Sequence, residues 1–122
     1  MNDGQGIYAF EKLKTWQKAN SLSIAVYRLT NAFPASERYG LIPQMRRASI
    51  SIQSNIAEGS ARITKKDQSH FYTMSFSSLM ELLNQLILSK DLGMLTEEEY
   101  QQIRTELSLV AKLLNGLRKS LK

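Results

Sequence analysis

The chain has 122 residues, of which 16 are basic and 11 acidic, and it contains no cysteine. This length favours one domain that folds without covalent cross-links, and the lack of cysteine excludes disulfides, thiolate nucleophiles and thiolate metal sites. The net charge of +5 is compatible with an anionic partner such as nucleic acid, although it also simply favours solubility. No apolar run approaches the roughly 18 residues of a membrane span and no signal-peptide pattern opens the chain, so we expect a cytoplasmic protein without a membrane partner.

Helix-period stretches separated by glycine and proline predict four helices and no strand. We expect residues 1–8 to form a flexible head and residues 9–122 to form one four-helix domain. The first helix is predicted from about Glu11 to Ala32, because the residue before Pro34 avoids the helical region. The second is predicted to begin near Pro43, a favoured first-turn residue, and to end at Gly59.

The third and fourth helices have clearer boundary signals. Thr64 to Asp67 forms a weak capping box and Gly93 is a C-terminal glycine, so a helix is predicted between them. Thr96, followed by glutamates, predicts the start of the fourth helix, whose apolar residues recur at alternating spacings of three and four up to Leu121. Short connections favour antiparallel neighbours. The sequence therefore predicts an all-α, antiparallel up-down-up-down four-helix bundle.

The third helix has more apolar surface than one bundle core requires. One apolar stripe includes Phe71 and Leu82, a second stripe runs beside it, and the fourth helix has two leucines off its main seam. Because a large exposed apolar patch marks an interface, we predict a homo-oligomer; the alternative is that the first helix covers the second stripe. The predicted interface consists of Tyr72, Phe76, Leu79, Leu83, Ile87, Leu109 and Leu113.

The segment from Arg46 to Gly59 combines an apolar helix face with a polar stripe. Arg47 and Glu58 end that stripe about 16 Å apart, too far to pair with each other. If the second and third helices form a hairpin, Arg47 comes close to Glu81, and an ion pair inside the bundle or at a subunit interface is our first interpretation. Contact of Arg47 with phosphate is the second. Asn55 is either a buried residue that fixes register or a binding group.

Basic residues outside the apolar faces are the candidate nucleic-acid contacts, although the basic excess is spread along the chain without an arginine-rich arm. Arg46 points about 100° away from Arg47, so we expect it to be exposed with its guanidinium free for a partner. Three more residues lie at a helix N-terminus, which favours anions; for any one of them, solvated surface is the alternative. The predicted set is Arg38, Arg46, Arg62, Lys65 and Lys66.

Residues for catalysis are missing from the sequence. One histidine, His70, and no cysteine cannot build a convincing metal site or a histidine-based triad. There is no glycine-rich phosphate loop, and the serines are better explained as small helix-packing residues than as nucleophiles. We therefore predict no enzyme, no cofactor and no metal.

Several segments together resemble one protein family. These segments are Phe10 to Ala19, Phe33-Pro34, Glu37 to Leu41, Gln44 to Ala48, Ser51 to Gly59, Ser78 to Leu82 and Gln85-Leu86. They resemble the bacterial four-helix bundle proteins encoded by intervening sequences in 23S ribosomal RNA genes, although Leu83 stands where that family commonly has an acidic residue. The resemblance implies a ring-like homopentamer and kinship with the accessory proteins of diversity-generating retroelements, basic pentamers that bind nucleic acid and a reverse transcriptase.

Two functions are consistent with these residues. The first is a non-enzymatic homo-oligomer, pentameric by resemblance, that binds RNA or DNA through a basic surface, with structured RNA favoured. The second is a protein-interaction scaffold in which the basic charge is incidental.

Overall fold

The computed structural model describes residues 8–122, which form four α-helices and two short 3₁₀ turns without a strand. The elements in chain order are η1 (Ala9–Lys12), α1 (Lys14–Asn31), η2 (Ala35–Glu37), α2 (Leu41–Ser60), α3 (Lys65–Asp91) and α4 (Glu97–Ser120). The prediction of an all-α fold with four helices is confirmed. The predicted flexible head, residues 1–8, lies outside the described residues except for Tyr8.

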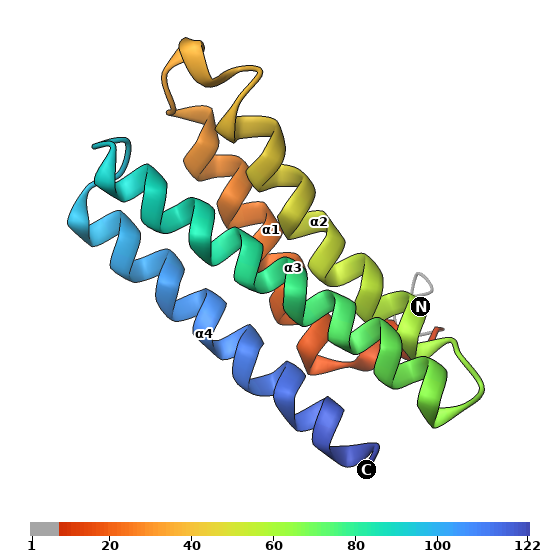
Figure 1. The fold of residues 1–122 in the computed structure, drawn as a ribbon. Helices are drawn as coiled ribbons and strands as arrows, with labels where there is room; N and C mark the ends of the chain where they lie inside the picture. Colours follow the sequence, from red (N-terminus) through yellow and green to blue (C-terminus); the bar gives the residue numbers. More distant parts are fainter. Residues whose placement is uncertain (1–7) are drawn as a thin grey trace, which may run out of the picture.

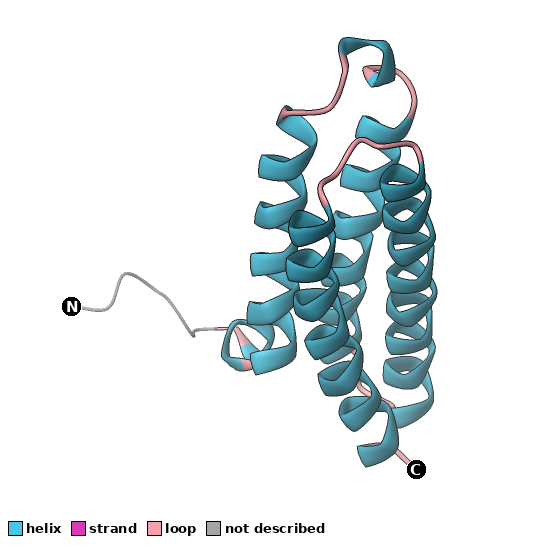
Figure 2. Cartoon of the chain, turned by 90° about the vertical axis from the view of Figure 1, so that its left-hand side faces the viewer, coloured by secondary structure: helices cyan, strands magenta, loops and turns pink. Residues whose placement is uncertain are grey.

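Each helix packs against its neighbours in the sequence, and α4 closes the arrangement against α1. The α1–α2 and α3–α4 connections lie at one end of the molecule, and the α2–α3 connection lies at the other end with the C-terminus (Figure 1). Figure 2 shows the four helices side by side along one long axis, joined by short loops. Turn η1 rests against α1 and α2.

Local capping sets both ends of α3 and the start of α4. Thr96 Oγ1 accepts the Glu99 N–H at 3.0 Å and the Glu99 carboxylate accepts the Thr96 N–H at 2.9 Å, which is the predicted capping box. Thr64 Oγ1 caps α3 in the same way, through the N–H of the third helical residue. Gly93, with φ of +79°, ends α3, and its N–H bonds to the Lys90 carbonyl at 2.9 Å.

The second helix begins at Leu41, two residues before the predicted Pro43. The carboxylate of Glu37 accepts the Leu41 N–H at 3.0 Å and so extends the helix backwards. This contact requires glycine at position 40, because a Cβ on Gly40 would lie 2.6 Å from Glu37 Oε1.

The predicted first helix is divided into η1 and α1. Leu13 has extended backbone angles, φ −75° and ψ 123°, and separates the two elements. The Phe10 and Trp16 rings pack edge to face across this break, with centroids 4.9 Å apart. The boundary between η1 and α1 thus coincides with aromatic packing, and no glycine or proline marks it in the sequence.

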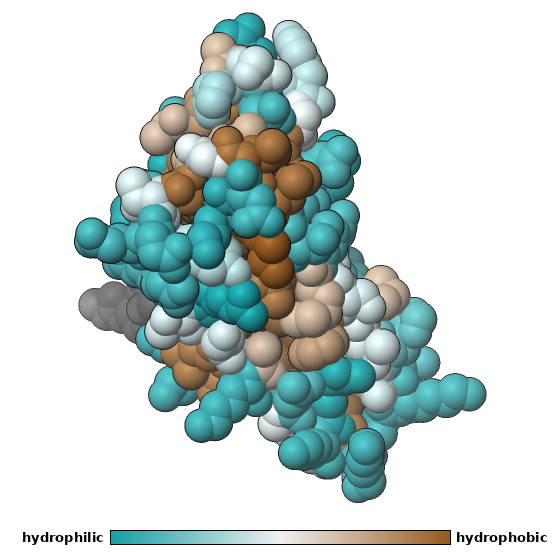
Figure 3. All heavy atoms as spheres, turned by 60° about the vertical axis from the view of Figure 1, so that its left-hand side comes forward, coloured by the Kyte–Doolittle hydropathy of each residue, from teal (hydrophilic) through white to brown (hydrophobic). Residues whose placement is uncertain are grey.

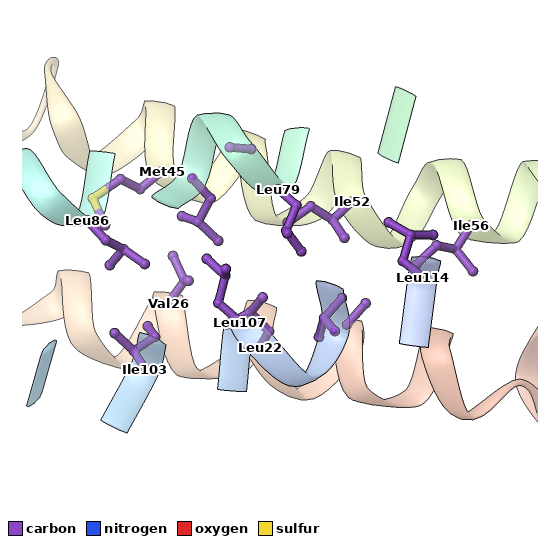
Figure 4. Close-up of a cluster of buried hydrophobic side chains, with 14 of the residues drawn as sticks. Leu22, Val26, Met45, Ile52, Ile56, Leu79, Leu86, Ile103, Leu107 and Leu114 are labelled. Carbon is purple, nitrogen blue, oxygen red and sulfur yellow. The ribbon is translucent and has the colours of Figure 1, made fainter. Parts of the chain in front are cut away.

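Apolar residues from all four helices form the core (Figure 4). The seam predicted on the fourth helix is confirmed from Tyr100 to Leu114, which are buried at the expected positions. The labelled core residues are Leu22, Val26, Met45, Ile52, Ile56, Leu79, Leu86, Ile103, Leu107 and Leu114.

The second apolar stripe predicted on the third helix is largely covered within the chain, which corrects the predicted interface. Tyr72 and Leu79 lie in the core with only 4% and 0% of their surface exposed. They are buried because the core-facing side of α3 falls between the two stripes rather than on one of them. Phe76 and Leu83 are half-buried against the core, and Ile87 is exposed.

On α4, Leu109 is exposed and Leu113 is half-buried. The outer side of α3 adds the exposed side chains of Met80 and Leu88. Figure 3 shows the side of the molecule that lies on the left in Figure 1, where hydrophobic residues form a narrow strip between hydrophilic ones. Fewer of the predicted interface residues are therefore accessible to a partner than the sequence suggested. None of the described helices is long and apolar enough to cross a membrane.

Candidate nucleic-acid interface

Some of the serine hydroxyls bind a facing helix, whereas Ser54 and Ser77 are exposed. Ser75 is fully buried and its hydroxyl donates to the Ile52 carbonyl at 2.7 Å. Ser23 donates to the Ser49 carbonyl at 3.1 Å. These two hydrogen bonds join α2 to the helices on either side of it, α3 and α1.

Asn55 is buried and takes part in a polar link between α2 and α3. Its Nδ2 donates to the Ser51 carbonyl at 2.9 Å and to Ser51 Oγ at 3.1 Å. The Ser51 hydroxyl in turn lies 2.9 Å from the Ser78 hydroxyl on α3. Asn55 is thus placed at a helix contact, and its role in fixing register stays a prediction.

Arg47 and Glu81 approach one another without forming the predicted ion pair within the chain. Both are exposed, and both line a small depression between α2 and α3 together with Gln44 and Ser51. Among residues 8–122, the salt bridge present joins Lys90 and Glu97 instead. Pairing of Arg47 with Glu81 across a subunit interface stays a prediction. Glu58 is exposed near the far end of α2.

Arg46 is not the free arginine that the sequence predicted. Its Nε donates to Thr30 Oγ1 at 2.9 Å, and its Nη2 donates to Asn31 Oδ1 at 3.0 Å. Nη2 also approaches the Tyr27 carbonyl at 3.4 Å, and the guanidinium carbon lies 4.5 Å from the centre of the Tyr27 ring. These partners come from the last turns of α1, which packs beside α2. Within the described chain, only Nη1 of this guanidinium lacks a hydrogen-bond partner.

Arg46 lines an open groove of about 600 Å³ between α1, the α1–α2 connection and α2. Arg38 from the connection and Arg47 from α2 line the same groove, with Tyr27 and Asn31 beside them. The described lining contains no carboxylate. Three arginine residues therefore line one groove whose lining contains no acidic residue.

The charge of the first two helices explains this excess. From the start of α1 to the end of α2, residues 14–60, the sequence has six basic residues and two acidic residues, Glu37 and Glu58, whereas residues 61–122 have nine and seven. The basic excess is thus larger over the first two helices than over the last two. Glu37 is not among the residues that line the groove, and its carboxylate accepts the Leu41 N–H at the start of α2. The six basic residues are Lys14, Lys18, Arg28, Arg38, Arg46 and Arg47.

The remaining predicted nucleic-acid contacts lie at the opposite end of α2. Arg62 follows Arg46 by 16 residues, which is about 24 Å along a helix axis. Arg62 stacks on the Phe71 ring at 4.5 Å, and Lys65 and Lys66 are exposed in the first turn of α3. The predicted basic residues thus form two separate groups rather than one surface, because α2 holds them apart.

No group of three or more His, Cys, Asp or Glu side chains in the described part of the chain could hold a metal ion. His70 is exposed, and its ring meets the Phe71 ring edge-on at 5.6 Å.

Fold and groove together define an all-α, four-helix protein with an arginine-lined groove between its first two helices. Residues 11–116 match the family of 23S rRNA-intervening sequence proteins, and the chain belongs to this family. The resemblance given by the sequence segments is therefore confirmed.

The fold is similar to that of a protein of unknown function from the S23 ribosomal protein family of Bacteroides thetaiotaomicron, known from its crystal structure. The TM-score is 0.77 at 20% sequence identity, over 86% of this chain and 98% of that chain. No curated protein matches the sequence.

Proposed function

We propose that the protein binds nucleic acid, with RNA as the first ligand to test, through the groove lined by Arg38, Arg46 and Arg47. One observation carries the proposal: three arginine residues line one groove that has no acidic residue in its lining. Guanidinium groups match phosphate oxygens in charge and in hydrogen-bond geometry. The family description, which refers to intervening sequences of 23S rRNA, makes RNA a reasonable first choice.

The fixed position of Arg46 supports phosphate binding in particular. Binding normally orders a flexible side chain at a cost of about 0.5–1.5 kcal/mol. Thr30, Asn31 and the Tyr27 ring already hold Arg46, so much of this cost is met by folding. The two N–H groups of Nη1 remain available to donate to a ligand.

The affinity of the groove can be tested by fluorescence anisotropy with a labelled RNA hairpin, between about 50 and 200 mM salt. The double variant Arg38→Gln/Arg47→Gln removes two exposed guanidinium groups and leaves the hydrogen bonds of Arg46 in place. A matched control, Lys112→Gln/Lys119→Gln, makes the same change of charge on exposed positions of α4.

We expect the wild type to bind with an affinity that falls steeply with salt, and the groove variant to bind at least about tenfold more weakly. The control should lose much less. No RNA binding at the lowest salt, or an equal loss in both variants, would refute the proposal.

We further propose that the helices form an up-down-up-down bundle and that the chain assembles as a homo-oligomer, a ring of five as the family resemblance implies. Exposed apolar side chains on α3 and α4, such as Ile87, Leu88 and Leu109, support contact between copies. The protein is proposed to act in the cytoplasm as a binding protein and not as an enzyme. Light scattering coupled to size-exclusion chromatography should give a multiple of the chain mass; a monomer mass would contradict the assembly.

A second candidate function, a protein-interaction scaffold, is supported by a groove between α1 and α4. This groove measures about 580 Å³, includes the apolar residues Ile24, Leu29 and Ile103, and has Arg28 opposite Glu106. Apolar contacts with a charged rim are the usual composition of a protein interface. A single protein partner recovered after nuclease treatment, and lost in an Ile24→Asp variant, would favour this function over RNA binding.

A further inference from the structure

We propose that the arginine groove takes an unpaired nucleotide of single-stranded RNA, with its phosphate on the arginines and its base stacked on the ring of Tyr39. This inference rests on the proposed function and adds the strandedness of the ligand. It follows from the turn that precedes α2 and from the side chains that this turn leaves in solvent.

Tyr39 lies in the turn before α2, next in the chain to the groove residue Arg38, although it is not itself one of the residues that line the groove. The side chain is 90% exposed. It directly follows Arg38, which lines the groove, so the two Cα atoms are about 3.8 Å apart. A full aromatic ring is therefore available to solvent one residue away from an arginine of the groove.

The turn that carries this ring is well ordered. The Glu37 N–H bonds to the Pro34 carbonyl at 2.9 Å, and the Gly40 N–H bonds to the Glu37 carbonyl at 3.0 Å. The Glu37 side chain caps α2, so it also ties the turn to the bundle. The backbone of the turn is thus held without help from the Arg38 and Tyr39 side chains, which remain free for a ligand at little cost in backbone ordering.

Aromatic stacking distinguishes unpaired from paired nucleotides. Every base has a π-face that can stack on an aromatic side chain, but bases inside a duplex already stack on each other. Arginine contacts to phosphate are available to both forms. The aromatic side chain that lines the groove, Tyr27, already has Arg46 stacked on its ring. Tyr39 is therefore the side chain that we expect to make the protein prefer a single strand.

The test compares a labelled single-stranded RNA with the same RNA annealed to its complement, at fixed low salt. Three variants are measured beside the wild type. Tyr39→Leu removes the ring, Tyr39→Phe keeps it, and Tyr8→Leu makes the same change at another exposed tyrosine, which is not next to a groove residue in the chain. Melting curves and light scattering check that folding and mass are unchanged.

We expect tighter binding of the single strand, and a loss of about tenfold in its affinity, ~1.4 kcal/mol, for Tyr39→Leu. Tyr39→Phe and Tyr8→Leu should bind as the wild type does, and duplex affinity should not respond to any of the three changes.

Equal affinity for both RNAs, or no effect of Tyr39→Leu, would overturn this inference while RNA binding by the groove still stood. Competition by adenosine monophosphate at matched nucleotide concentration would assign the site to a free nucleotide and would also overturn it. A changed oligomer mass in Tyr39→Leu would show that the ring serves assembly instead. If neither RNA binds, the proposed function itself fails.

Discussion

Gly59 is a position where one added methyl group should destabilise the bundle. It is buried near the end of α2, and an added Cβ would lie 2.7 Å from Cε1 and 2.9 Å from Cδ1 of Tyr72. It would also lie 3.1 Å from the Cβ of Phe71. The Tyr72 ring is itself buried, so it cannot give way by swinging into solvent. Gly59→Ala should therefore push α2 and α3 apart.

Gly116 provides a matched control for the magnitude. It lies on the exposed side of α4, and an added Cβ there meets nothing within 4 Å. Both substitutions gain up to about 1 kcal/mol in helix propensity, but only Gly59→Ala carries a steric cost, about 1–3 kcal/mol for an overpacked core. We expect Gly116→Ala to raise the free energy of unfolding by up to ~1 kcal/mol. The free energy of unfolding of the Gly59→Ala variant should be ~1–3 kcal/mol lower than that of the Gly116→Ala variant.

Urea denaturation followed by circular dichroism, at one fixed protein concentration, measures this difference. In a Tyr72→Leu background the cost of Gly59→Ala should shrink, because the ring that it meets is gone. Equal stability of the two alanine variants, or an undiminished cost in that background, would refute the steric explanation.

Two further predictions concern polar contacts. In a denaturation experiment, Arg46→Lys should lower the free energy of unfolding by ~1–3 kcal/mol, because lysine cannot reproduce the hydrogen bonds to α1. The control Arg38→Lys should leave the free energy of unfolding unchanged. Similar effects of the two substitutions would contradict this explanation. NMR titration should find the pKa of Glu97 below its ordinary value, because the Gln101 amide donates to its carboxylate and the Lys90 ammonium lies 3.1 Å away. This lowered pKa stabilises the fold at pH values above the pKa of Glu97 in the unfolded chain, and the stabilisation is lost as the pH falls through the pKa of Glu97 in the folded chain. Gln101→Ala should raise the Glu97 pKa. An unchanged Glu97 pKa in that variant would disprove this origin.

Helix boundaries were predictable where they depend on a few neighbouring residues. The capping box at Thr96 and the glycine end at Gly93 act within one turn of the chain, so the sequence contains the whole cause. The break at Leu13 was not predicted, because it is accompanied by packing of two aromatic rings and has no glycine or proline to mark it.

The environment of Arg46 could not be read from its own helix. Periodicity gives the direction of a side chain around one axis, but not which residues of a neighbouring helix lie opposite. The partners of Arg46 are on α1, 15 to 19 residues earlier in the chain. The same limit explains why Tyr72 and Leu79 were assigned to a surface stripe although the rotation of α3 places them in the core. Tyr27 and its contact with Arg46 had no sequence signal that would have identified them.

The dependence of RNA affinity on salt tests phosphate binding by the arginine groove most directly. For single-stranded nucleic acid, each phosphate contact contributes about 0.7 to the slope of log affinity against log salt. Arg38→Gln/Arg47→Gln should therefore flatten the slope by ~1.4 relative to the wild type, if each arginine contacts one phosphate. The Lys112→Gln/Lys119→Gln control should keep the wild-type slope. A groove variant with the wild-type slope would contradict phosphate binding by these arginines.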